Sequence, residues 1–161
     1  MDNFQLDKRL AADCIVLGYL YDVSESEVTD TVAIDKQAAA SILLLMNNAD
    51  FNWFVIVPMG VSVIDVDELP EAKQLQMLKE VNALSAFLKR HYPVDKINFA
   101  SIGNIVNQMH FHLVARTEQD TAWPAVVWGT IATKKYSNEQ IEKLKFLLEK
   151  EIDFFKLDLN V

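Results

Sequence analysis

The chain has 161 residues, 51% of them hydrophobic, and a formal net charge of −8 at pH 7. This length and composition suit one globular domain with a buried core and exclude an intrinsically disordered chain. The acidic charge, with basic clusters only at Lys89-Arg90 and Lys134-Lys135, excludes a protein that binds long nucleic acids but not one that binds a small phosphorylated ligand.

The sequence also bounds where the protein works. No apolar run is long enough to span a membrane, and residues 1–7 lack the basic and apolar regions of a signal peptide. The single cysteine, Cys14, excludes an internal disulfide and lies in an apolar run that is typical of a buried, inert thiol. We therefore expect a cytoplasmic protein with neither a membrane nor a nucleic acid as its partner.

The first part of the chain is predicted to form a short helix and three strands. Apolar residues at helical spacing predict the helix, and Asp7 is a suitable N-cap. Runs of β-compatible apolar residues predict the strands, and the last two form an antiparallel hairpin around the turn at 47–50. The elements, in order, are a helix over 4–13, a strand over 14–21, a polar loop over 22–30, a stretch over 31–40 that fits either a helical turn or a strand, and strands over 41–46 and 53–58.

The clearest helix in the pattern comes next. Asp67 is a suitable N-cap, Pro70 fits the first turn, and Pro93 stops the helix. Cations in the last turn suit the helix dipole, and His91 is interpreted as an exposed residue of that turn. The apolar positions at helical spacing predict an inward face made of Leu75, Leu78, Val81, Leu84 and Leu88.

Two strands follow, over 96–100 and 106–116, and the short turn between them predicts that they pair antiparallel. After a loop over 118–129, a second amphipathic helix is predicted over 137–157, begun by a capping box of Ser137 and Gln140. Its apolar face would be made of Ile141, Leu144, Leu147, Leu148, Ile152 and Phe155.

This order of elements predicts an α+β fold with an antiparallel sheet. The chain shows no repeat, low-complexity segment or linker. We expect one domain, in which residues 1–135 form the main part and residues 136–161 add a C-terminal helix.

The stretch 107–114 strictly alternates polar and apolar residues, which predicts a strand with one buried face. Two of the three histidines in the chain lie in it. Met109, Phe111 and Leu113 would point to one side, and the other side would carry a row made of Gln108, His110 and His112.

Three interpretations of this row are open. The first is structural, with both histidines satisfied by neighbours on a half-exposed sheet. The second is a zinc or iron site, for which a carboxylate such as Asp120 would have to supply a third ligand. The third is nucleophilic attack on phosphorus by one imidazole while the other donates a hydrogen bond to a phosphate oxygen, beside a Gly103-Asn104 turn whose N–H groups approach the phosphate.

Residues 103–116 resemble the signature of the histidine triad (HIT) superfamily, in which His-φ-His-φ-His-φ-φ follows a glycine-containing phosphate loop, φ being apolar. The resemblance runs from about residue 4 to residue 130. Over this range the chain is similar to a bacterial branch of HIT-domain proteins that is diadenosine-polyphosphate-hydrolase-like. The other stretches that carry it are Asn47-Asn48, the strand 53–58, Asp67-Glu68-Leu69, Lys96-Ile97-Asn98, residues 120–124 and Trp128-Gly129.

The resemblance implies the HIT α+β fold, with an antiparallel sheet of about five strands and a long helix, to which this chain adds the C-terminal helix. It implies a homodimer, a nucleotide as the small-molecule partner, and no metal or other cofactor. The implied activity is hydrolysis or transfer at an α-phosphate through a nucleotidyl-histidine intermediate, on dinucleoside polyphosphates or nucleoside phosphoramidates. The alternative is a HIT-fold nucleotide-binding or dimeric interaction protein with little or no turnover.

The resemblance also implies a role for each residue of the motif. His110 stands at the position of the nucleophile, and His112 stands at the position that binds and polarises the phosphate. The positions implied to bind phosphate are Asn98, Gly103, Asn104, Ile105 and Gln108, and those implied to bind the ribose are Asn47 and Asn48.

The chain departs from the family pattern at three positions. Gln108 replaces the first triad histidine, and its amide keeps hydrogen-bonding capacity but cannot carry a proton as an imidazole does. Asn48 stands where the family often has a ribose-binding Asp, and Met59 replaces a basic residue. Trp123 and Trp128 are expected to pack in the core or an interface rather than to stack on a base.

Overall fold

The computed structural model describes residues 4–22 and 39–157. The fold is α+β, with a six-stranded antiparallel sheet in the order β4-β5-β3-β2-β1-β6. Its elements are α1 (Lys8–Asp13), β1 (Cys14–Tyr21), β2 (Ala39–Met46), β3 (Asn52–Pro58), the 3₁₀ helix η3 (Val66–Glu68), α2 (Glu71–His91), β4 (Lys96–Ala100), β5 (Phe111–Arg116), α3 (Asn138–Glu151) and β6 (Phe155–Leu157).

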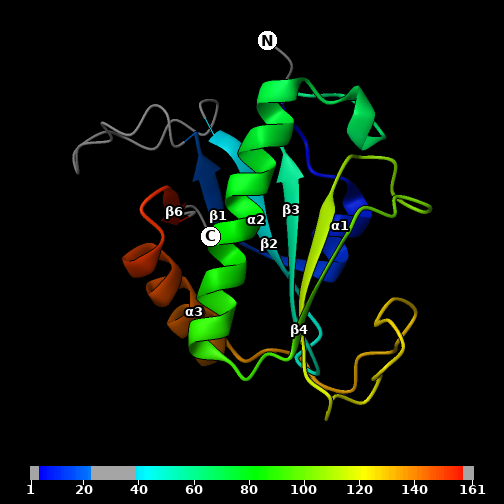
Figure 1. Ribbon diagram of the computed structural model, residues 1–161, viewed down its shortest axis with the longest axis vertical. Coiled ribbons are helices and arrows are strands. Elements are labelled where there is room, and N and C mark those ends of the chain that lie inside the picture. The colour runs from blue at the N-terminus through cyan, green and yellow to red at the C-terminus, as the bar shows by residue number, and fades with distance from the viewer. Residues whose placement is uncertain (1–3, 23–38, 158–161) are drawn as a thin grey trace.

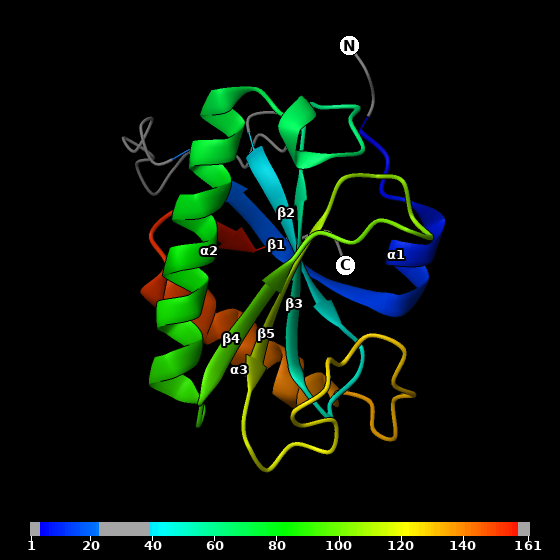
Figure 2. The same cartoon turned by 45° about the vertical axis from the view of Figure 1, so that its right-hand side comes forward.

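The two faces of the sheet are covered differently. The long helix α2 runs across one face with α3 beside it, and α1 lies on the other side of the strands (Figures 1 and 2). The helix-covered face includes Phe54, Phe87 and Phe111, all nearly inaccessible to solvent. The opposite face packs Leu10 of α1 and Val127 of the loop after β5 against the sheet. We call this second side the histidine face, because His110 and His112 lie on it.

Most of the predicted elements are confirmed. The predicted strands over 14–21, 41–46, 53–58 and 96–100 all form, two of them slightly longer than predicted. The first helix is shorter than predicted because it begins only after Asp7, whose side chain accepts a hydrogen bond from the N–H of Arg9 as an N-cap. The predictions for residues 23–38 lie outside the described residues.

The predicted start of α2 is wrong. Asp67 belongs to η3, where Asp65 and Glu68 form a reciprocal capping box, and α2 itself begins after Pro70. Proline lacks a backbone N–H, which the first residues of a helix do not need for intrahelical hydrogen bonds. Pro70 therefore separates the 3₁₀ helix η3 from the start of α2.

The predicted inward face of α2 is only partly right. Val81, Leu84 and Leu88 are buried as expected, but Leu75 and Leu78 are 54% and 47% exposed. The helix instead turns Met77 and a polar pair, Gln76 and Glu80, toward the core. Amphipathic spacing alone did not reveal that buried polar groups would displace leucines from the contact face.

The C-terminal helix is also shorter than predicted. It begins with the expected Ser137–Gln140 capping box but ends at Glu151, and residues 155–157 form β6 instead. This strand pairs with β1 where Gly18 lies, and a Cβ on Gly18 would collide with the carbonyl oxygen of Lys156. The missing side chain at Gly18 therefore makes room for the sixth strand, which the sequence did not predict.

The predicted strand 106–116 forms only from Phe111 onward. β4 pairs no further than His112 and β3 no further than Phe111, so Gln108 and His110 precede the ladder. The alternation still holds, because Met109 and Phe111 pack into the helix-covered core while the His110 and His112 rings lie together on the other side. In the part of the chain that the structure describes, no helix combines the length and apolar character that crossing a membrane requires.

Candidate active site

His110 and His112 form a close pair where β5 begins. His112 lies between Val55 of β3 and Ala100 of β4, so the sheet holds its backbone on both sides. The two rings are perpendicular, with centroids 4.8 Å apart, and the residues are only 5% and 6% exposed. The predicted pair of adjacent imidazoles on one face is therefore present.

The hydrogen bond of His110 determines where its proton lies. Nδ1 of His110 is 2.7 Å from the main-chain carbonyl oxygen of Gln108. A carbonyl oxygen only accepts, so Nδ1 carries the hydrogen and donates it. In the neutral ring, the lone pair is then on Nε2, which has no hydrogen bond to any described residue.

His112 has the opposite arrangement. The indole N–H of Trp53 donates to Nδ1 of His112 at 3.0 Å, so the ring hydrogen of a neutral His112 must be on Nε2. Burial, with a smaller contribution from the charge of His110, lowers the pKa of His112 from its ordinary 6.5 to about 3. His112 is therefore a neutral imidazole with an Nε2–H to donate.

The two rings together offer a lone pair and a hydrogen-bond donor side by side. A lone pair on Nε2 of His110 is what a nucleophile requires, and the N–H of His112 can stabilise negative charge on a phosphate oxygen. Trp128 packs edge-on against His112 with a centroid distance of 5.5 Å and also contacts Trp53. The indoles of Trp53 and Trp128 enclose His112. Trp128 therefore packs in the core, as predicted.

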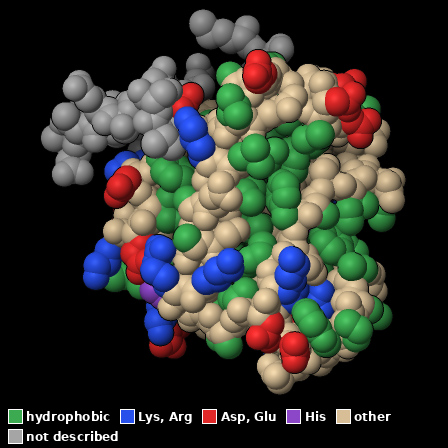
Figure 3. Space-filling model, in the orientation of Figure 1, with side chains coloured by type: hydrophobic (Ala, Val, Ile, Leu, Met, Phe, Trp, Pro, Cys, Tyr) green, Lys and Arg blue, Asp and Glu red, His purple; other side chains and the backbone are tan. Residues whose placement is uncertain are grey.

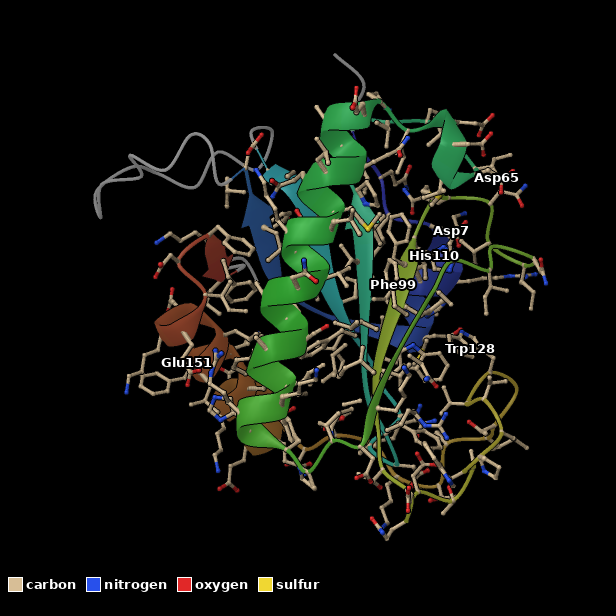
Figure 4. The ribbon with its side chains drawn as sticks, in the orientation of Figure 1. Asp7, Asp65, Phe99, His110, Trp128 and Glu151 are labelled. Atoms are coloured by element: carbon tan, nitrogen blue, oxygen red, sulfur yellow. The ribbon has the colours of Figure 1, made fainter. Side chains whose placement is uncertain are left out.

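Gln108 contacts the N-terminal segment of the chain. Its side-chain oxygen accepts from the N–H of Asp7 at 2.8 Å, and its amide NH₂ donates to the carbonyl oxygen of Gln5 at 3.0 Å. Asp7 and His110 lie side by side at this end of the sheet (Figure 4). Gln108 therefore ties the segment before α1 to the histidine pair, and its predicted contact with phosphate stays a prediction.

The predicted phosphate loop lies between β4 and β5. Gly103 has φ of +65°, a conformation that favours glycine, although a Cβ there would have room. Asn104 is exposed, and Ile105 is 74% exposed. The loop is thus accessible from outside, next to two buried histidines.

Asn98, the other predicted phosphate contact, lies on β4 and accepts a hydrogen bond from Arg116 at 2.9 Å. Arg116 is almost fully buried and also binds the carboxylate of Asp120 through two nitrogens and the carbonyl oxygen of Ala125. This network fixes the loop after β5, which brings Trp128 to His112. Asp120, considered as a metal ligand, is occupied by Arg116 instead.

Asn47 and Asn48, the predicted ribose contacts, lie in the turn between β2 and β3. The turn follows Met46 and precedes Asn52, which pairs with Ala115 at the far end of β5 from His110. Asn47 accepts from the N–H of Tyr136 at 3.2 Å, and the 5%-exposed Asn48 accepts from the N–H of Asp50. Asn48 thus stabilises its own turn, whereas Asn47 connects the turn to the segment before α3.

The third histidine is not part of the site. His91 lies at the end of α2, where its Nε2 is 2.7 Å from the carboxylate of Glu151 on α3, away from His110 (Figure 4). Within residues 4–22 and 39–157, no three His, Cys, Asp or Glu side chains gather as a metal site would require.

Sequence reasoning missed Trp53 and Arg116 as parts of the site. Trp53 and His112 are 59 residues apart in the chain, and only the register of β3 with β5 brings them together. The period-2 pattern placed Trp53 on a strand, but it could not show which strand lies beside it.

Comparison with known proteins agrees with the resemblance to the histidine triad superfamily. Residues 25–119 match the HIT domain family, and no curated protein matches. Three solved structures are similar over most of the chain: histidine triad proteins from Marinobacter aquaeolei (33% identity, TM-score 0.77, 93% of this chain and 96% of that one), Sinorhizobium meliloti (29%, 0.77, 93% and 98%) and Bradyrhizobium japonicum (28%, 0.76, 92% and 98%).

Proposed function

The chain belongs to the HIT domain family, and on this premise we propose that it is a nucleotide hydrolase or transferase that attacks an α-phosphate with Nε2 of His110. The observation that carries the proposal is the pair of complementary hydrogen bonds at the histidines. Gln108 holds the proton of His110 on Nδ1, and Trp53 holds that of His112 on Nε2.

In the first step, the Nε2 lone pair of His110 forms a bond to phosphorus. The bond from phosphorus to the leaving group breaks, and its electron pair departs with the leaving group. Nδ1–H stays bonded to the Gln108 carbonyl oxygen, which stabilises the positive charge that the ring gains. The Nε2–H of His112 donates to a non-bridging phosphate oxygen, where charge develops.

In the second step, water or another acceptor attacks the same phosphorus. Its oxygen forms the new bond, the electrons of the P–N bond return to Nε2, and the proton of water passes to solvent. With water, the product is a nucleoside monophosphate. The cycle leaves His110 as it began.

We assign the surrounding polar groups to the phosphate and the ribose. N–H groups of residues 103–105 would bind phosphate oxygens, in keeping with the positive φ of Gly103 and the exposure of the loop. Asn98 and Gln108 would contribute amide donors, and Asn47 and Asn48 would contact the ribose. The substrates would be dinucleoside polyphosphates or nucleoside phosphoramidates.

A second candidate function is a nucleotide-binding or dimeric interaction protein with little turnover. The observation in its favour is that Gln108, at the first triad position, has both ends of its amide bonded to the N-terminal segment. An amide so engaged orients the protein's own backbone rather than a substrate.

The test is turnover of diadenosine polyphosphates and an adenosine phosphoramidate by wild type, His110→Ala and His91→Ala. We expect AMP release by wild type and by the His91 variant, and a loss on the order of 10⁴-fold for the His110 variant. His91 is the matched control because it is bonded to Glu151 instead. If wild type binds AMP but releases none from any substrate, the proposed enzyme activity is overturned in favour of the nucleotide-binding function.

We also propose that two copies pair through the β4 edge of the sheet, in the cytoplasm. Gln76 and Glu80 of α2 face β1 and β2, so the helical period places the exposed Leu78 on the opposite side of the helix, toward β4. Hydrophobic side chains gather beside α2 in Figure 3, and β4 adds an exposed Phe99. β4 has a strand on one side only among the described residues, and a second copy of β4 would cover that edge.

The oligomeric state of Leu78→Glu tests this pairing. We expect wild type to elute as a dimer in light-scattering chromatography and the variant to shift to a monomer. Phe146→Glu is the control, because Phe146 is 63% exposed on α3. A monomeric wild type would overturn the pairing.

A further inference from the structure

The hydrogen bond from Trp53 to His112 restricts what His112 can do with its proton. An indole has one N–H and no acceptor, so Trp53 can only donate. Both partners are buried, Trp53 at 6% and His112 at 6% exposed, and they lie two residues out of register on the same face of neighbouring strands. A second proton on Nδ1 of His112 would point at the indole N–H.

We propose that Trp53 is a positioning residue that makes His112 a hydrogen-bond donor unable to give up a proton, and that the site therefore selects substrates whose leaving group departs as a stable anion. This inference rests on the proposed attack at an α-phosphate. It narrows the substrate class to nucleotides with a phosphate-type leaving group and excludes efficient use of phosphoramidates.

The reason is the proton balance of bond cleavage. When phosphorus–oxygen cleavage releases a phosphate end, the oxygen keeps the electron pair as an anion and needs no proton. When phosphorus–nitrogen cleavage releases an amine, the nitrogen needs a proton from a general acid. His112 could supply one only if its Nδ1 were already protonated, since a neutral donor would otherwise become an anionic imidazolate.

No other side chain in contact with the pair replaces this acid among the described residues, and the carboxylate of Asp7, beside His110 in Figure 4, accepts the N–H of Arg9 as the cap of α1. The rings that contact His112 are those of Trp53, Trp128 and His110, and the Nδ1–H of His110 is bonded to the Gln108 carbonyl oxygen. Gln108 carries an amide, which is not acidic. The carboxylate of Asp120 is held by Arg116, and this hydrogen bonding lowers its pKa. The low pKa of His112 agrees with an imidazole that stays neutral.

Trp128 offers a matched control for Trp53. Its ring packs against His112 at nearly the same centroid distance, 5.5 Å in both cases, but its Nε1 is buried without a hydrogen-bond partner among the described residues. Trp53→Phe and Trp128→Phe therefore both keep an aromatic ring beside His112. Only the first removes the hydrogen bond to Nδ1.

The first measurement is the tautomer of His112, read from ¹⁵N shifts of the histidine ring between about pH 5 and about pH 8. In wild type and Trp128→Phe we expect Nδ1 to stay pyridine-like and Nε2 to stay protonated throughout. In Trp53→Phe we expect a mixed signal that titrates at higher pH than in wild type. A protonated Nδ1 in wild type, or equal spectra for all three proteins, would overturn the role of Trp53.

The second measurement is AMP release from AMP aryl esters of graded leaving-group acidity and from an adenosine phosphoramidate. For wild type we expect the rate of AMP release to fall steeply as the leaving group becomes more basic. AMP release from one of these aryl esters, the nitrophenyl ester, should be about 10²-fold faster than from the phosphoramidate. In Trp53→His, whose ring can exchange a proton with His112, this ratio should fall at least about tenfold. Equal rates for ester and phosphoramidate in wild type would overturn the selectivity.

The two measurements separate this inference from the proposed function. If no substrate releases AMP, the proposed function and the leaving-group selectivity both fail, while the ring spectra still decide whether Trp53 holds the tautomer. If wild type is active but without selectivity, the proposed function stands and this inference fails.

Discussion

The protein has a buried ionisable side chain on each face of its sheet, and the two differ in what they leave free. Glu80, on the helix-covered face, is fully inaccessible, and both of its carboxylate oxygens are occupied, one by the Ser41 hydroxyl and one by the Gln76 amide. His112, on the histidine face, is nearly as buried but has only Nδ1 occupied. A satisfied buried group connects elements, whereas one with a free polar atom can act on a ligand.

Burial favours the neutral form of both groups, so the two cost stability when the pH changes in opposite directions. It raises the pKa of Glu80 from its ordinary 4.5 to about 7, against the hydrogen bonds from Ser41 and Gln76, and lowers that of His112 from 6.5 to about 3. The folded state therefore loses stability as pH rises from 4.5 through 7 because of Glu80. It loses stability as pH falls from 6.5 toward 3 because of His112.

The largest effect should come from the network that supports the histidine face. Arg116→Ala leaves the Asp120 carboxylate and the Asn98 and Ala125 oxygens without their donor, and removing one partner of a buried pair costs on the order of 3 to 5 kcal/mol. Urea unfolding should show this loss. Arg90→Ala, at an exposed pair with Glu151, should change the midpoint little. Equal losses for both variants would contradict a special role for the buried network.

The next effect separates chemistry from packing at His112. His112→Ala removes the proposed donor to the phosphate, and AMP release should fall about 10²- to 10³-fold in kcat. Glu80→Gln, a substitution at the corresponding buried group of the other face, should leave kcat within about twofold. A similar loss of kcat in both variants would mean that both groups merely support the fold.

The third prediction concerns the pH dependence of stability. The shift of Glu80 from 4.5 to about 7 corresponds to about 3 kcal/mol of stability that is present below pH 4.5 and lost above pH 7. Glu80→Gln removes the charge and should flatten this loss, so that the variant is more stable than wild type at pH 8. Thermal melts of both proteins across this range provide the check, and parallel curves would show that Glu80 does not titrate there.

The smallest effect should appear at α3, whose Glu151 lies away from His110 (Figure 4). Ser137→Ala removes the hydroxyl that caps α3 and should cost about 1 kcal/mol of unfolding free energy. AMP release per folded molecule should not change. A loss of kcat in this variant would show that the C-terminal helix takes part in the site, and the contrast between the two faces would weaken.

Local patterns in the sequence predicted much of this protein. Alternation around His110 and His112 placed both rings on one side of a strand, because side chains alternate wherever the backbone is extended. The caps at Asp7 and Ser137 follow from hydrogen bonds within three residues, so they too are readable locally. Membership of the HIT family follows from the same local motif and its context.

Tertiary structure alone determined the properties that make the two faces different. The tautomer of His112 depends on Trp53, the support of the loop depends on Arg116 and Asn98, and the burial of Glu80 depends on Ser41. Each of these contacts joins elements that the chain brings together only through strand order and register. The periodicity of a sequence predicts which face of its element a side chain lies on. It does not predict which residue that side chain contacts, because long-range packing determines the neighbouring element.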